Sequence, residues 1–134
     1  MAIFLDPLEA VIAAFEIQKN FAGLNEYRRI SGEEPIEMRI GINTGMVILG
    51  SVGTRKRMDW TALGDVVNTA SRIEKSGEAN SVLVSESTYE KVKDHVTVRR
   101  SFTQKVKGKE EQIMLHFLQS VNYLSGGEKK YIEL

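Results

Sequence analysis

An asparagine and an arginine four positions apart are the residues of this sequence that point most directly to chemistry. Asn68 and Arg72 lie in residues 65–73, where apolar side chains recur at helical spacing. Residues four apart share one face of a helix, so the Asn68 amide and the Arg72 guanidinium are expected to lie side by side. Together they can hold a sugar oxygen and a negative charge that develops on a phosphate. The alternative interpretation is a solvated helix face that binds nothing.

The local pattern predicts the elements that position this pair. Residues 58–63 favour a short strand, Gly64 ends it, and Asp65 suits the N-cap of the following helix. The opposite face of that helix is apolar and is expected to pack on the core. It consists of Val66, Ala70 and Ile73, with Val67 at its edge.

The rest of the chain alternates between helical and strand patterns. A long amphipathic helix is expected to begin with Asp6 as N-cap and Pro7 at its first position, and to stop near Gly32. Residues 1–5 are expected to be the end of a strand. Further strands are predicted at 37–42, 46–49, 82–84, 96–102 and 113–118, and a short helix at 86–93 capped by Ser85. This order of elements predicts an α+β fold.

Composition narrows the class of protein. The chain has 134 residues, enough for one domain with a core, and its 18 basic residues balance its 18 acidic ones. This balance argues against a nucleic-acid or anionic-membrane partner. Cysteine is absent and no apolar run reaches the length of a membrane span. We therefore expect a cytoplasmic protein with no membrane contact in this segment.

The run at residues 59–72, DWTALGDVVNTASR, resembles the signature of class III nucleotidyl cyclase (adenylate/guanylate cyclase) catalytic domains. Three further blocks, at 39–53, 81–89 and 106–109, resemble segments of the same family in the same order. The resemblance covers residues 1–119 and leaves 120–134 as a C-terminal tail or linker. It implies a ferredoxin-like sandwich, a mostly antiparallel sheet with helices packed on it, whose first strand and helices are missing.

The resemblance also implies an activity. The family converts a nucleoside triphosphate to a 3′,5′-cyclic nucleotide and pyrophosphate, by attack of the ribose 3′-oxygen on the α-phosphorus. In this chain Asn68 would orient the ribose, and Arg72 would hold the α-phosphate in the transition state.

Two further substrate contacts follow from the same resemblance. Lys107 would contact the terminal phosphates, with Lys105 and Lys109 as the other candidates. Thr61 occupies the position that helps to read the purine. Its hydroxyl can accept a hydrogen bond from the adenine amine, which favours ATP over GTP.

The family's metal ligands have no counterpart here. The family uses two magnesium or manganese ions held by two aspartates, which the resemblance places, with a purine-reading lysine, before the segment matching residues 1–4. Asp59 and Asp65 are not at those positions, and His95 and His116 are expected to be ordinary half-buried residues. We therefore expect no metal site in this chain and no activity from the chain alone.

The family builds each active site between two subunits. Thr61, Asn68 and Arg72 are thus expected to face a nucleotide-sized cleft at a subunit boundary. A missing first strand would leave a sheet edge and an apolar surface exposed, which favours a homodimer or an altered, domain-swapped oligomer. Two other interpretations stay open: a non-catalytic, cyclase-like module for dimerisation or regulation, and an unrelated ferredoxin-like domain.

Overall fold

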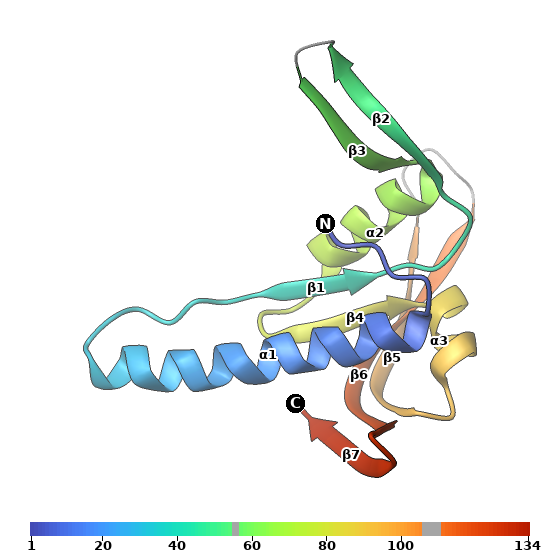
Figure 1. Ribbon diagram of the computed structural model, residues 1–134. Coiled ribbons are helices and arrows are strands. Elements are labelled where there is room, and N and C mark those ends of the chain that lie inside the picture. The colour runs from blue at the N-terminus through green and yellow to red at the C-terminus, as the bar shows by residue number, and fades with distance from the viewer. Residues whose placement is uncertain (55–56, 106–110) are drawn as a thin grey trace.

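The computed structural model of the chain describes residues 1–54, 57–105 and 111–134. Three helices and seven strands lie in these ranges (Figure 1). The helices are α1 (Pro7–Ile30), α2 (Asp65–Ser76) and α3 (Glu86–Val92). The strands are β1 (Arg39–Ile42), β2 (Ile48–Thr54), β3 (Arg57–Leu63), β4 (Ser81–Ser85), β5 (Val96–Lys105), β6 (Gln112–Ser125) and β7 (Glu128–Glu133).

The main sheet has the strand order β1-β4-β6-β5, and β7 pairs with the far part of β6. The β1–β4 pair is parallel, whereas β4–β6, β5–β6 and β6–β7 are antiparallel. Strands β2 and β3 form a separate antiparallel pair, which projects away from the body beyond α2 (Figure 1). The mostly antiparallel sheet with helices packed on it confirms the predicted α+β class.

Helices cover both faces of the sheet, and the central strand β4 is therefore buried throughout. Val82 and Val84 pack on one side with Phe15 of α1, in a cluster that also includes Val92 of α3. Leu83 points to the other side, where it packs with Ile73 of α2. This alternation, which follows from the two-residue repeat of a strand, places α2 on the face opposite α1 and α3.

The starts of two helices confirm the expected caps. The Asp6 side chain accepts a hydrogen bond from the Leu8 amide at 2.8 Å, and Pro7 is the first residue of α1. The Ser85 side chain accepts from the Thr88 amide at 3.3 Å and so caps α3. Short polar side chains at these positions satisfy amides that have no partner within the helix.

The start of α2 differs from the prediction by one residue. Asp65 is already helical, and Gly64 takes the N-cap position without a side-chain cap. Its φ of 135° lies in the region that glycine adopts far more readily than other residues. The need for this backbone conformation, rather than a capping side chain, decides where α2 begins.

Both ends of the chain differ from the expected elements. Residues 1–5 form no strand. Residues 120–134, expected to be a tail or linker, complete β6 and form β7. Gly126 and Gly127 have φ values of 59° and 81°, which suit the tight turn of a hairpin, and Ile132 packs against the core cluster on the α1 side. The glycine pair therefore marks a hairpin turn. No helix in the described ranges has the length and apolar character needed to cross a membrane.

Candidate functional site

Helix α2 carries the predicted pair and is held closely against β1. A Cβ atom on Gly41 of β1 would lie only 2.3 Å from the backbone nitrogen of Glu74, so a larger residue would push the helix away. Ile73 is fully buried beside this contact. The apolar face of α2 thus lies against the body of the molecule, as the helical spacing predicts.

Asn68 and Arg72 are both exposed on α2. Within the described residues, neither side chain makes a hydrogen bond or an ion pair. Their amide and guanidinium groups therefore keep their full capacity to bind a ligand.

Arg72 differs in this respect from the other arginines whose side chains the structure describes. Each of those is paired with a glutamate, which lies at or just after the end of α1, in α2, or in the connection between α2 and β4. The pairs are Arg28–Glu33 at 2.7 Å, Arg29–Glu26 at 2.6 Å, Arg39–Glu74 at 3.4 Å, and Arg99 and Arg100 with Glu78.

The structure places the other predicted contacts only in part. Thr61 lies in β3, opposite Gly50 of β2 and four residues before the start of α2. Lys107 and Lys109 lie outside the described residues. Lys105, the exposed end of β5, pairs with Gln112 at the start of β6.

Two cavities border α2. The smaller, about 380 Å³, is lined by Thr69 of α2 and by Gln112, so the start of β6 lies near the residue that follows Asn68. The larger, about 750 Å³, lies between α1, β1, residues 1–5 and the apolar side of α2. Neither Asn68 nor Arg72 lines these two cavities. Neither cavity is therefore the expected nucleotide cleft.

The described residues do not fit a divalent-cation site. Hard cations require several converging oxygen ligands. Over residues 1–54, 57–105 and 111–134, no group of three or more histidine, cysteine, aspartate or glutamate side chains is placed to hold a metal ion.

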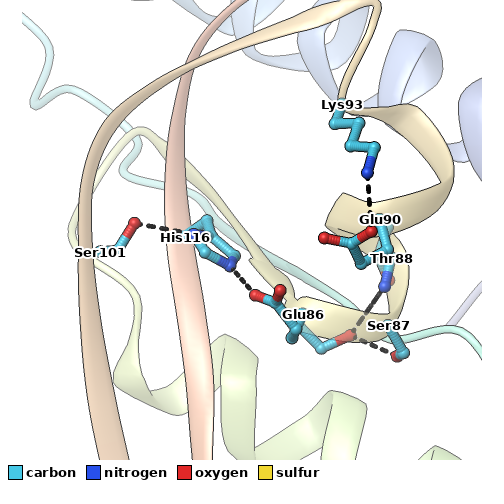
Figure 2. A network of polar contacts seen from close by, with 8 residues as sticks. Glu86, Ser87, Thr88, Glu90, Lys93, Ser101 and His116 are labelled. Carbon is cyan, nitrogen blue, oxygen red and sulfur yellow. Dashed lines mark hydrogen bonds and ion pairs between the residues drawn. The ribbon is translucent and has the colours of Figure 1, made fainter.

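A polar network that the sequence did not predict links α3 to β5 and β6 (Figure 2). His116 of β6 is 7% exposed. Its Nδ1 lies 2.7 Å from the Ser101 hydroxyl on β5, and its Nε2 bonds the Glu86 carboxylate on α3. The Tyr89 ring lies 4.4 Å from the imidazole, centroid to centroid. His116 is thus a satisfied, buried residue that joins α3 to the sheet.

A second set of hydrogen bonds, made by the Ser87 hydroxyl and the Asn43 amide, connects α3 to α2. Ser87 donates to the Thr44 carbonyl at 2.9 Å, or to Asn43 Oδ1 at 3.2 Å. Asn43 Nδ2 in turn donates to the Val66 carbonyl in the first turn of α2, at 3.0 Å. In the sequence Asn43 simply follows the strand predicted at 37–42. Only the tertiary fold shows that it reaches α2.

Two charged side chains at the exposed end of α3, Glu90 and Lys93, form an ion pair with each other. Lys93 donates a hydrogen bond to Glu90 at 2.9 Å (Figure 2). This contact lowers the pKa of the Glu90 carboxyl and raises the pKa of the Lys93 ammonium. The pair is solvent-exposed, so it contributes little to stability.

Comparison with known proteins gives one consistent result. The family model for the adenylate and guanylate cyclase catalytic domain matches residues 6–120. "Adenylate cyclase 1" of Rhizobium meliloti (strain 1021) is 38% identical over 98 residues, which is 72% of this chain and 15% of that protein.

Two crystal structures share the fold. The guanylyl cyclase Cya2 has a TM-score of 0.80 at 32% identity, over 86% of this chain. The adenylyl cyclase CyaB from P. aeruginosa has a TM-score of 0.78 at 34% identity, over 84%. The chain spans 58% of each of these two structures. On the family match, the sequence identity and the shared fold, the chain belongs to the adenylate and guanylate cyclase catalytic domain family.

Proposed function

We propose that this chain provides the nucleotide-positioning part of an active site that forms a 3′,5′-cyclic nucleotide and pyrophosphate from a nucleoside triphosphate. The observation that supports this most is the state of Arg72. It is exposed on a helix whose opposite face is fixed against the sheet, and no described acidic side chain neutralises it. The other arginines whose side chains the structure describes are all paired. A guanidinium in this state is suited to bind phosphate.

In the proposed reaction, the ribose 3′-oxygen attacks the α-phosphorus and the pyrophosphate leaves. Asn68 would hold the ribose by its amide, and Arg72 would stabilise the charge that develops on the α-phosphate oxygens. Lys107 would contact the terminal phosphates. We derive no step through a metal ion, because the described residues do not fit one.

A second subunit would complete the site. Asn68 and Arg72 are exposed and line neither of the two cavities that border α2. Among the described residues nothing encloses them, so we propose that a cleft around them needs a further surface. We propose that this surface belongs to a second cyclase subunit.

The proposed substrate is ATP rather than GTP. The Thr61 hydroxyl can accept a hydrogen bond from the adenine amine. The relatives include both adenylyl and guanylyl cyclases, so the choice depends on Thr61. In direct competition, ATP should displace bound GTP more readily than the reverse.

The decisive experiment is a titration of the isotope-labelled chain with ATP and with GTP, followed by amide NMR. We expect the largest shifts at residues 65–73, and stronger binding of ATP. Shifts confined to other elements, or no binding of either nucleotide, would contradict the proposal. The same samples, supplied with manganese, should form no cyclic nucleotide, and turnover that persists through repurification would show that the chain alone is active.

A further inference from the structure

The two halves of α2 are held in different ways. Ile73 and Glu74 lie tightly against the sheet, next to Gly41. In the first half, Val66 and Val67 are only half-buried and border the larger cavity. Apolar packing therefore fixes the end of α2 more firmly than its start.

The local hydrogen bonds at the start of α2 are also weak. Gly64 offers no side-chain cap. The Gly64 carbonyl receives the amides of Val67 and Asn68 at 3.2 and 3.4 Å, both longer than the usual 2.9–3.0 Å. A side chain that bonds the first turn to the sheet would therefore help to fix its position.

Asn43 supplies this contact. Its Nδ2 donates to the Val66 carbonyl at 3.0 Å, two residues before Asn68. It lies in the connection directly after β1, so it ties the first turn of α2 to the sheet.

Asn43 is itself held by the start of α3. Its Oδ1 accepts from Ser87 at 3.2 Å. Beside it, the Thr44 and Thr88 hydroxyls are 2.9 Å apart, and Thr88 is fully buried. Ser87 and Thr88 lie in the first turn of α3, and this turn is itself bonded to β6 through the Glu86–His116 contact (Figure 2).

We infer that Asn43 is a positioning residue that sets the place of Asn68 and Arg72 for the nucleotide, an inference that rests on the proposed function. It does not touch the substrate. The Asn43 side chain donates a hydrogen bond to the Val66 carbonyl, and the Ser87 hydroxyl, by donating to Asn43 Oδ1, fixes the orientation of the Asn43 amide. Its loss should loosen the first half of α2 and leave the sheet intact.

The test compares Asn43→Ala and Asn43→Asp with the matched control Asn25→Ala. Asn25 makes the same kind of two-way contact, to the amide and carbonyl of Ile36 at 2.7 and 2.8 Å, but at the far end of α1. Asn43→Asp keeps an acceptor for Ser87 and loses the donor to Val66, so it should behave like the alanine variant.

ATP affinity is measured by calorimetry and local opening by amide hydrogen exchange on the full chain. Both Asn43 variants should bind ATP about fivefold more weakly, the effect of one lost hydrogen bond. They should speed exchange at residues 67–71 and leave β4 unchanged, while Asn25→Ala leaves both ATP affinity and exchange in α2 as in the parent chain. In a chain that already carries Arg72→Ala, Asn43→Ala should reduce ATP affinity by less than it does in the parent chain, because Asn43 acts by positioning the Arg72 side chain.

Unchanged affinity and exchange in the Asn43 variants would overturn the inference. So would equal acceleration of exchange in α2 and β4, because that would show a general loss of stability. If the parent chain binds neither ATP nor GTP, the proposed function fails. The exchange pattern alone then decides whether Asn43 positions α2.

Discussion

Arg72 is the residue on which the proposed chemistry most depends. We expect Arg72→Ala to weaken ATP binding roughly tenfold or more, because hydrogen bonds to charged groups contribute about 1.5–3 kcal/mol. Its side chain is exposed and makes no ion pair with the described residues, so the free energy of unfolding should change by less than about 0.5 kcal/mol. Calorimetric titration and urea unfolding measure the two quantities.

The matched control for this variant is Arg29→Ala. Arg29 is also exposed on a helix, but it is paired with Glu26 at the far end of α1. Its loss should leave ATP affinity unchanged. Equal losses of affinity in the two variants would indicate a non-specific effect of charge.

His116 illustrates a residue whose role is structural. Because the imidazole is buried and bonded at both nitrogens, His116→Ala leaves a cavity and removes the hydrogen bonds to the exposed Ser101 and Glu86. We expect a loss of about 2–4 kcal/mol in the free energy of unfolding. The ring of the half-buried His95 makes one hydrogen bond with the described residues, to the Asn122 carbonyl, so His95→Ala should cost far less stability. Comparable losses in urea unfolding would argue against this assignment.

Tyr123 should make stability depend on alkaline pH. Its partial burial, and then its hydrogen bond to Glu16, raise the pKa of the Tyr123 phenol. A raised pKa in the folded state stabilises the protein below the ordinary tyrosine pKa of about 10, and this contribution is lost as pH rises through the raised value. Tyr123→Phe should therefore lose less stability between pH 9 and 11 than the parent chain in thermal unfolding. Parallel losses would show that Tyr123 does not contribute.

At the scale of elements, the close packing of α2 against β1 depends on Gly41. Gly41→Ala places a methyl group 2.3 Å from the Glu74 backbone, so we expect α2 to shift and the protein to lose more than about 2 kcal/mol. Gly23→Ala is the control, because Gly23 lies inside α1 with nothing near its missing Cβ. It should stabilise the chain by about 0.5–1 kcal/mol. Chemical denaturation should show a lower free energy of unfolding for Gly41→Ala and a higher one for Gly23→Ala.

Elements with strong local signals could be predicted from the sequence. Asp6, Pro7 and Ser85 mark helix starts whatever surrounds them, and the spacing of Val66, Ala70 and Ile73 gave the buried face of α2. Strand β7 could not be predicted in the same way. Its charged and apolar residues acquire a strand conformation only by pairing with β6, a contact set by the tertiary fold.

The site was predictable to a similar extent. The spacing of Asn68 and Arg72 predicts a shared exposed face, and the structure has both side chains exposed on α2. The link from Asn43 to Val66 joins residues 23 apart, and no local pattern encodes it. The roles of Asn68, Arg72, Thr61 and Lys107 toward a nucleotide stay predictions until binding is measured.

At the scale of the whole molecule, we expect self-association. Strand β1 pairs only with β4 among the described strands, so one of its edges is open. The projecting β2–β3 hairpin and the segment just before it expose large apolar side chains. Met46 is 93% exposed and Ile48 is 72% exposed. An open strand edge and an apolar surface both favour pairing with another chain. Light scattering during size-exclusion chromatography should show a dimer that dissociates on dilution, and a monomer at all concentrations would contradict this.

The strand order also has a kinetic consequence. Strands β5, β6 and β7 pair with their neighbours along the chain, so their contacts are quick to form. The parallel ladder of β1 with β4 joins Arg39 to Ser81 and must first enclose β2, β3 and α2 in one long loop. We expect the carboxyl-terminal meander to assemble early during refolding. The segment that carries Asn68 and Arg72 would then be among the last to reach its final position.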